Sequence, residues 1–418
     1  MTRIIFVNRY FAPDHSATSQ ILTDLATDLS ARGRDVHVIT GDETYGGDAR
    51  LSSFECIAGV HVHRVSSGGL GRTSLTRRAA DYLVLYAAMY GAAKKLLRPG
   101  DILVAKTDPP LLSIPMSRAA KQQRARLVNW LQDLYPEVAG ALNVPMAKGG
   151  LGRALARLRD RSLQAADTNV VIGERMGERL LARGIPPSRV TMIPNWANDA
   201  EIEPMVPHDN ILRAAWGLTD KFVLGYSGNL GRAHECETLL AAAGLLHGRP
   251  DIAFLFIGGG HHVEQLRAQA AMRGLSDRFH FRPYQDRRQL KLSLGVADAH
   301  WLSLRPELEG LIVPSKFYGI AAAGRPLISV TSPSGEIARL VTRFACGFVA
   351  APGDAAQLAK HILNLADDPV ERMAMGARAR QMLLSHYTKR HALAQWSALF
   401  ETLLSRRPTR EHDQVGDG

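Results

Sequence analysis

The chain has 418 residues, of which 46% are hydrophobic and 22% are charged, and this composition excludes an intrinsically disordered protein. Such a length exceeds what one hydrophobic core usually serves, so two domains are expected. The formal net charge of +11 favours an anionic partner: a phosphate-bearing substrate, a membrane surface or nucleic acid.

Cysteine usage and the chain start indicate the compartment. The three cysteines, Cys56, Cys236 and Cys346, are far apart and form no CxxC pair, so neither a disulfide framework nor a zinc site is indicated. The first residues, MTRIIFVNRYFAP, hold too short an apolar core for a cleavable signal peptide, and no apolar run approaches the length that spans a bilayer. We therefore expect a cytoplasmic protein.

Short apolar runs alternate with helical patterns along almost the whole chain. In the first half they include RIIFVN, VHVIT, DILVAK, RLVNW and TNVVIG, and in the second half FVLGYSG, AFLFIGGG, HWLSL and RPLISV. Short strands that are apolar on both faces and separated by helices are typical of parallel sheets covered on both sides. We predict an α/β protein with two doubly wound, Rossmann-like domains that face each other across a cleft, where ligands of this architecture bind.

The periodic pattern is lost in VTMIPNWANDAEIEPMVPHDN, where proline and asparagine gather. We place the domain boundary in this stretch, because linkers have this composition. The predicted domains are residues 1–197 and 198–385. A C-terminal helix, 386–405, is expected to pack back toward the first domain, and a polar tail, 406–418, follows it.

Two basic stretches of the first domain have helical spacing. Residues 72–100 surround the apolar run LVLYAAMY with basic side chains, and GRALARLRDR places Arg153, Arg157 and Arg161 four residues apart. Each helix could present a solvated face over a core, or a surface that rests on anionic lipid. Nucleic acid is disfavoured, because no reading motif accompanies the charge.

The stretch GYSGNLGRAHECETLLAAA leads a strand through Gly228, Asn229, Gly231 and Arg232 into a helix. A helix amino end attracts phosphate, and an arginine adds a bidentate donor. The alternative is a plain strand-to-helix turn. Neither a G-x-G-x-x-G nor a G-x-x-x-x-G-K-[ST] pattern occurs here, so a nicotinamide enzyme and a P-loop nucleotidase are disfavoured.

The stretch FIGGGHHVEQL repeats the arrangement, with glycines at 258–260 that allow a ligand to approach the backbone closely. A plain turn is again the alternative. His261 and His262 are adjacent, so their side chains diverge on a helix, and no carboxylates have matching spacing. We interpret them as solvated histidines and predict no metal site.

The stretch EGLIVPSKFYGIAAAGRPLI places Lys316 at the start of a short helix, after Pro314 and Ser315. A lysine charge there opposes the positive end of the helix dipole unless an anion is bound beside it. The alternative is a surface lysine that points away. We predict that Lys316 holds an anionic group of a ligand.

The ordered set FAPD, QDLYPE, MIPNW, GYSGNLGR, FIGGG and EGLIVPSKFYGIAAAGRPLI resembles the retaining, nucleotide-sugar-dependent glycosyltransferases of family four, which have the GT-B fold. The resemblance covers about residues 1–405. It is strongest to the branch that builds colanic acid, O antigen and other exopolysaccharides, which includes fucosyl and N-acetylfucosaminyl transferases. It implies that the first domain binds the acceptor and the second the donor.

Carried over by position, the resemblance implies a donor site. Arg232 and Lys316 match basic residues that hold the donor diphosphate, and Glu309 matches a glutamate that faces the donor sugar. The glycines at 258–260 match a loop near the nucleoside. The implied donor-binding residues are Gly228, Asn229, Arg232, Gly258, Gly259, Gly260, Pro283, Tyr284, Glu309, Gly310, Leu311, Ser315 and Lys316.

In the first domain, Asp133 of QDLYPE occupies the position where the family places a His or Asp near the reacting carbon, although an Asp after a strand can also be a helix cap. The first strand-to-helix loop has Ser16, Ala17 and Thr18 where many members have paired glycines. One departure concerns the family's E-x7-E element. Its second glutamate should fall at Phe317 or Gly319, and neither is acidic, so recognition of the ribose must differ.

These features lead us to expect a retaining hexosyltransferase that moves a sugar from a UDP- or GDP-sugar to a saccharide acceptor, possibly linked to polyprenyl diphosphate. Asp133, Arg232 and Lys316 are the predicted catalytic residues, and no metal or other cofactor is required. An anionic membrane surface at the inner face of the plasma membrane is the further expected partner. The alternatives are a nucleotide-sugar epimerase of similar architecture and a non-catalytic GT-B-like binding protein.

Overall fold

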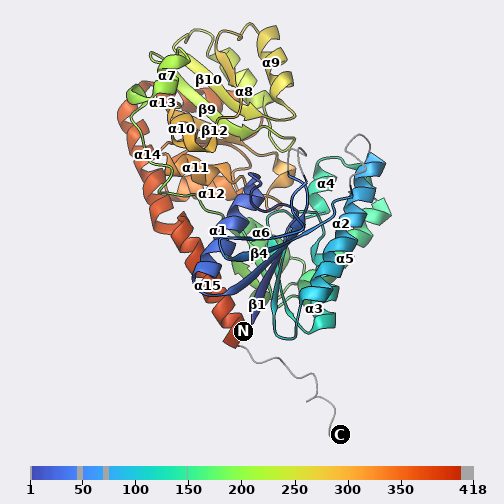
Figure 1. Ribbon diagram of the computed structural model, residues 1–418. Helices are drawn as coiled ribbons and strands as arrows, with labels where there is room; N and C mark the ends of the chain where they lie inside the picture. Colours follow the sequence, from blue (N-terminus) through green and yellow to red (C-terminus); the bar gives the residue numbers. More distant parts are fainter. Residues whose placement is uncertain (1, 45–49, 69–74, 148, 406–418) are drawn as a thin grey trace. The chain divides into compact units, whose positions relative to one another are not determined.

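The computed structural model describes residues 2–44, 50–68, 75–147 and 149–405, and it divides into two compact units (Figure 1). Unit 1 comprises Met1–Ile172, Gly177–Ile193 and Leu393–Gly418. Unit 2 comprises Gly173–Met176 and Pro194–Ala392. The chain thus leaves unit 1 after Ile193, and its last helix returns to unit 1 at Leu393.

Unit 1 contains an eight-stranded sheet in the order β3-β4-β2-β1-β5-β6-β7-β8, parallel except for the edge pair β3 and β4. The chain moves outward from β1 on one side and resumes at β5 on the other, so loops diverge where β1 meets β5. The strands are β1 (Arg3–Val7), β2 (Asp35–Gly41), β3 (Phe54–Ile57), β4 (Val60–Val65), β5 (Ile102–Lys106), β6 (Arg126–Leu131), β7 (Thr168–Val171) and β8 (Val190–Met192).

Helices cover this sheet because its central strands are apolar on both faces. Ile5 and Val7 of β1 pack with residues of α2 and α3, whereas Phe6 points to the opposite face and meets Phe400 of α15. The helices are α1 (Ala17–Ala31), α2 (Leu75–Leu96), α3 (Ser113–Gln123), α4 (Glu137–Ala141), η1 (Pro145–Ala147), α5 (Gly149–Ala165), α6 (Glu174–Leu181), η2 (Pro187–Arg189) and α15 (Lys389–Ser405).

Unit 2 contains a six-stranded parallel sheet in the order β11-β10-β9-β12-β13-β14. Here the strand order reverses between β9 and β12. The strands are β9 (Phe222–Asn229), β10 (Ile252–Gly259), β11 (Phe279–Arg282), β12 (Ala299–Ser303), β13 (Leu327–Val330) and β14 (Gly347–Ala350). Their core includes the buried rings of Phe254, Phe279 and Trp301, packed with residues of α8 and α13.

The remaining helical segments of unit 2 flank this sheet. They are η3 (Pro207–Asp209), α7 (Ile211–Ala215), α8 (Glu237–Leu245), α9 (Val263–Met272), η4 (Arg287–Gln289), α10 (Leu290–Gly295), η5 (Pro306–Leu308), α11 (Lys316–Ala322), α12 (Glu336–Arg343), α13 (Ala355–Asp367), α14 (Pro369–Met382) and η6 (Leu383–Tyr387). The predicted fold class, two doubly wound Rossmann-like domains, is confirmed. Within the described ranges, no helix combines the length and apolar character needed to cross a bilayer.

Candidate functional site

In unit 2, the two glycine loops lie side by side at the carboxyl ends of β9 and β10. Gly228 pairs with Gly258, and Asn229 pairs with Gly259. The φ angles of Gly228, Gly258 and Gly260 are 133°, 128° and 129°, which side-chain-bearing residues rarely adopt. A Cβ atom at Gly258 would lie only 2.3 Å from the carbonyl oxygen of Gly228. The glycines are therefore required by the close approach of the two strand ends.

A cavity of about 340 Å³ opens at this end of the sheet. The ring of Tyr284 lies over its glycine floor, because Cβ atoms at Gly258 and Gly259 would come within 3.1 and 3.2 Å of that ring. Aromatic walls above a glycine floor can hold a planar ring. The lining residues are Tyr226, Gly228, Leu230, Phe256, Ile257, Gly258, Gly259, Gly260, Val263, Glu264, Arg267, Phe281, Arg282 and Pro283.

Lys316, the first residue of α11, lies beside the first glycine loop. A Cβ atom at Gly228 would be 2.4 Å from its Cε, and its Nζ is 5.5 Å from the ring centroid of Tyr226. Among the described residues, no hydrogen bond or ion pair reaches this ammonium group, and burial lowers the pKa of Lys316 to about 8. A partly buried cation in this state is well placed to bind an anion. With only seven residues, α11 contributes little dipole, so burial rather than the dipole dominates.

Behind the glycine loop, the buried His234 and Tyr226 form a hydrogen-bonded pair that was not predicted from the sequence. The Tyr226 hydroxyl lies 2.6 Å from the Asn229 carbonyl oxygen and 3.0 Å from His234 Nε2, and His234 Nδ1 lies 2.8 Å from the Ser303 carbonyl oxygen. Burial, aided by the charge of Lys316, lowers the pKa of His234 to about 3. A neutral imidazole thus holds the loop from behind. Nothing in the sequence distinguishes this histidine from a solvated one.

Arg232 lies on the loop after β9 and is exposed. Helix α8 begins only at Glu237, so the guanidinium belongs to the loop and not to the helix entrance, where the sequence had placed it. An exposed arginine on a loop can turn toward a bound ligand. The assignment of Arg232 to the donor diphosphate stays a prediction.

Glu309 is 5% exposed and contacts the amino end of α12. Its carboxylate accepts a hydrogen bond of 3.3 Å from the backbone N–H of Glu336, and a Cβ atom at Gly335 would collide with its Oε1 at 2.2 Å. Burial raises the pKa of Glu309. This hydrogen bond engages one carboxylate oxygen, Oε2. Contact of Glu309 with a donor sugar stays a prediction, as do the roles assigned to Gly310, Leu311 and Ser315.

Phe317 and Gly319, the two candidate positions for the family's second glutamate, both lie in α11. Phe317 is 2% exposed and points into the core, so a ligand cannot reach it. At Gly319, a Cβ atom would make ordinary contact with Leu294, 3.7 Å away, so space for a side chain exists. The departure seen in the sequence therefore persists in the structure.

In unit 1, the predicted Ser16–Thr18 segment leads from β1 into α1, and the predicted Asp133 follows the carboxyl end of β6. The Nζ of Lys106 donates a hydrogen bond of 3.1 Å to the carbonyl of Thr18, next to Ser16 and Ala17, and its charge acts on Asp133. Burial above all, together with the charge of Asp108, raises the pKa of Asp133 to about 7, and the charge of Lys106 opposes the rise. A carboxyl group that titrates near neutral pH can exchange a proton with a bound substrate.

The helix-cap interpretation of Asp133 does not hold in the fold. Helix α4 begins at Glu137, Pro136 is its cap residue, and no side-chain hydrogen bond caps it. Asp133 instead lines a small cavity with Thr107, Tyr135 and Arg159.

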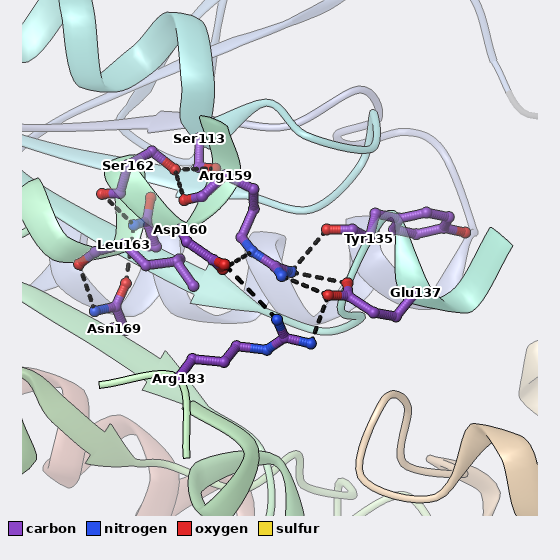
Figure 2. Close-up of polar contacts among 10 residues, drawn as sticks. Ser113, Tyr135, Glu137, Arg159, Asp160, Ser162, Leu163, Asn169 and Arg183 are labelled. Atoms are coloured by element: carbon purple, nitrogen blue, oxygen red, sulfur yellow. Dashed lines mark hydrogen bonds and ion pairs between the residues drawn. The ribbon is translucent and has the colours of Figure 1, made fainter. Parts of the chain in front are cut away.

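Figure 2 shows a cluster of ion pairs around Arg159 that fixes Tyr135 and Glu137 of the QDLYPE stretch. The buried Arg159 of α5 donates to the carbonyl of Tyr135 at 2.7 Å and to both carboxylate oxygens of Glu137, at 2.6 and 3.1 Å. Arg183 also contacts Glu137, at 2.6 Å, and Asp160 pairs with Arg159 at 2.8 Å. The positive charges of the two arginines equal the negative charges of the two carboxylates, so the cluster has no net charge. The glutamate of QDLYPE is thus structural, a role that the sequence motif did not reveal.

Comparison with known families gives one match for each half of the chain. Residues 17–196 match the family described as "Glycosyl transferase 4-like domain", and residues 209–382 match "Glycosyl transferases group 1". With the two Rossmann-like units, these matches identify the chain as a glycosyltransferase of the GT-B fold class.

Among curated proteins, the chain is 28% identical over 313 residues to the probable glycosyltransferase WbjE of Pseudomonas aeruginosa, covering 74% of this chain and 76% of that one. It is 29% identical over 287 residues to the putative colanic acid biosynthesis glycosyl transferase WcaI of Escherichia coli, covering 67% of this chain and 66% of WcaI. Sucrose-phosphate synthase from Thermosynechococcus elongatus has the same fold, with a TM-score of 0.78 at 18% identity over 97% of this chain and all of that one. HepE of Anabaena, solved with UDP, has a TM-score of 0.74 at 15% identity over 96% of this chain and all of HepE.

Proposed function

We propose that this glycosyltransferase is a retaining hexosyltransferase that uses a UDP- or GDP-sugar as donor. The saccharide acceptor is carried on a lipid such as polyprenyl diphosphate, and the product belongs to a cell-surface polysaccharide. The observation that carries this proposal is the ammonium group of Lys316, which lacks an anionic partner among the described residues and lies beside the glycine-floored cavity. The names of WbjE and WcaI support a role in polysaccharide synthesis, and the UDP and UDP-glucose bound to HepE support a nucleotide-sugar donor.

The proposed chemistry follows from the charges. As the bond between the sugar and the diphosphate breaks, negative charge grows on the leaving group, and Lys316 and Arg232 stabilise it. Asp133 acts at the reacting carbon, where positive charge develops. Lys316 and Arg232 supply the positive charge that a divalent metal ion supplies in other enzymes, so the proposal includes no metal.

The donor is tested by thermal shift with UDP, GDP and a panel of their sugars. A ligand that binds only the native state raises the melting temperature by mass action. We expect one nucleotide to stabilise the protein, and one of its sugars to be hydrolysed slowly without acceptor. An epimerised donor would indicate an epimerase, and no stabilisation by any nucleotide would contradict the proposed donor site.

We further propose that unit 1 binds anionic membranes through α2 and α5. Helix α3 packs against both, and all three lie on one side of the sheet (Figure 1). Leu83 of α2 and Leu151 of α5 are 69% and 54% exposed, and Arg153, Arg157 and Arg161 on α5 are exposed as well. Apolar and basic side chains together favour an anionic lipid surface. Residues 69–74, including Arg72, and the side chains of Arg77 and Arg78 lie outside the described part.

Anionic liposomes should retain the protein at low salt and release it at high salt, because surface attraction is screened. The double variant Arg153→Glu/Arg157→Glu should stay in the supernatant after sedimentation. The matched control, Lys360→Glu/Arg390→Glu, makes the same charge change at exposed positions of unit 2 and should bind like the parent. Equal recovery of the parent with and without liposomes would refute membrane association.

A further inference from the structure

Tyr226 of β9 is a buried residue that contacts both Lys316 and the first glycine loop. The Nζ of Lys316 lies over the Tyr226 ring, 5.5 Å from its centroid. The Tyr226 hydroxyl group donates a hydrogen bond of 2.6 Å to the carbonyl oxygen of Asn229, the last residue of β9. The ring and the hydroxyl group of one side chain thus meet two different parts of the candidate site.

The ring of Tyr226 is fixed by the aromatic core of unit 2. It packs against Phe256 and Trp301, with ring centroids 6.0 and 5.7 Å apart, and all three side chains belong to one buried cluster. A ring that is packed on several sides keeps one orientation, because protein interiors are close-packed. Its face therefore gives Lys316 a defined support, since an ammonium group over an aromatic face is attracted by the ring.

His234 fixes the hydroxyl group of Tyr226. The Nδ1 of His234 lies 2.8 Å from the carbonyl oxygen of Ser303, which can only accept, so Nδ1 carries a proton. Burial, aided by the charge of Lys316, keeps the pKa of His234 at about 3, so the imidazole is neutral and Nε2 is an acceptor. The Tyr226 hydroxyl lies 3.0 Å from this Nε2. Its proton is therefore located between two acceptors, the imidazole and the Asn229 carbonyl.

The backbone that Tyr226 holds is also fixed from the second glycine loop. The N–H of Leu230 donates to the carbonyl of Gly259 at 2.7 Å, and the carbonyl of Leu230 accepts from the backbone N–H of His262 at 3.1 Å. Two residues before Leu230, a Cβ atom at Gly228 would lie 2.4 Å from the Cε of Lys316. A displacement of this loop would therefore move the surface against which the Lys316 side chain lies.

We propose that Tyr226 is a positioning residue of the donor site: its ring supports the ammonium group of Lys316, and its hydroxyl group, held by His234, fixes the glycine loop. This inference rests on the proposed function, because it assigns Lys316 to the donor diphosphate. Tyr226 lines the cavity but is only 3% exposed, so it acts on a ligand through Lys316 and the loop.

Two substitutions separate the hydroxyl group of Tyr226 from its ring. Tyr226→Phe removes only the hydroxyl group and should weaken UDP or GDP binding by about 3- to 10-fold, the effect of a lost neutral hydrogen bond. Tyr226→Leu also removes the ring and should weaken binding by a further 2- to 5-fold or about that, the contribution of a cation–π contact. Calorimetric titration measures both losses.

The same two substitutions in a Lys316→Ala background test whether the ring acts through Lys316. There the phenylalanine and leucine variants should bind nucleotide equally, because the ring has no ammonium group to support. Such a double-mutant cycle isolates the coupling between two side chains. A merely structural ring would give the same difference between phenylalanine and leucine in both backgrounds, and that result would overturn the role of the ring.

His234→Ala tests the link through the hydroxyl group. It should weaken nucleotide binding about as much as Tyr226→Phe does, and it should add little when combined with Tyr226→Phe. The matched control is His361→Ala in α13, because His361 is likewise 8% exposed and its Nε2 lies 3.2 Å from a backbone carbonyl, that of Val349. Both alanine variants should melt earlier, but only His234→Ala should lose nucleotide affinity. Equal nucleotide affinity in the two variants would contradict the role of His234.

A measurement without nucleotide separates this inference from the proposed function. In protein labelled with ¹³C at lysine Cε, the Lys316 resonance is assigned by its loss in Lys316→Ala. The ring current of Tyr226 should shift the Lys316 Hε protons upfield, and this shift should remain in Tyr226→Phe and disappear in Tyr226→Leu, or in Tyr226→Met if the leucine variant does not fold. An unchanged Lys316 resonance after loss of the ring would overturn the inference. If the parent binds no nucleotide, the proposed donor site fails, and the Lys316 resonance still decides the role of Tyr226.

Discussion

Replacing Lys316 by alanine is expected to weaken binding of UDP or GDP by about 10- to 150-fold, or roughly 1.5–3 kcal/mol, the range for a hydrogen bond to a charged group. The reason is the position of its ammonium group beside Gly228, where a diphosphate would be its first anionic partner within the described part of the chain. Calorimetric titration of parent and variant measures the difference. The matched control is Lys291→Ala, since Lys291 pairs with Glu203 on the surface of the same unit, and its loss should not change nucleotide affinity.

Two further results distinguish a ligand-binding lysine from a structural one. Burial lowers the pKa of Lys316 from 10.5 to about 8, so the unfolded chain holds the proton more tightly and the charged form destabilises the empty fold. That penalty is fully present below pH 8 and fades as the pH rises toward 10.5. Lys316→Ala should therefore leave the melting temperature of the empty protein at pH 7 unchanged or higher. Nucleotide affinity of the parent should fall above pH 8. Unchanged affinity in the variant would refute the assignment.

Replacing Asp133 by asparagine is expected to lower turnover by about 10²–10⁴-fold, the usual contribution of a group that moves a proton or stabilises charge at the reacting centre. Nucleotide affinity should be nearly unchanged, because Asp133 lies in unit 1 and the glycine loops lie in unit 2. The pH profile of the parent should show an acidic limb near pH 7, where Asp133 titrates, and this limb should be lost in the variant. Steady-state kinetics with donor and acceptor varied separately measures both effects.

Asp133→Asn is also expected to change the stability of the protein, in a direction set by the pKa of Asp133. Burial raises the pKa of Asp133 from 3.8 to about 7, so the folded state binds the proton more tightly, and stability contributed by the protonated form is lost as the pH rises through this range. At pH 8 the asparagine variant should therefore melt at the same or a higher temperature. Asp28→Asn, the same change on the surface of α1, is the control and should leave turnover unchanged. Full turnover with earlier melting would show that Asp133 is only structural.

The central strands could be predicted because burial on both faces leaves an uninterrupted apolar run. RIIFVN and AFLFIGGG correspond to β1 and β10 within two residues at each end. Five strands were missed: β3, β4, β8, β11 and β14. These are edge strands or their neighbours, half exposed or only three to six residues long, and β4 alternates buried valines with histidines. Their strand character comes from pairing with a neighbour, which a local pattern cannot reveal.

The glycine loops were predictable for a related reason. Gly228 and Gly258 each follow an apolar run and precede a helical pattern, so their place at a strand end is local information. That the two loops touch, and that Lys316 lies against Gly228, depends on β9 pairing with β10 and lying next to β12. Parallel pairing brings strand ends together that are tens of residues apart in the chain.

The sequence by itself determined the class of fold and the positions of the glycine loops at the strand ends, because these follow from periodicity and from where glycine is needed. The tertiary structure alone decided which charges meet. Lys106 ends an ordinary apolar run, yet the carbonyl group that it contacts belongs to Thr18, 88 residues away. In the sequence, Arg159 cannot be distinguished from the exposed arginines of its own helix, and only the fold shows that it pairs with Glu137, 22 residues earlier. The effect of a charged group depends on its burial and its nearest opposite charge, and both are properties of the packed fold.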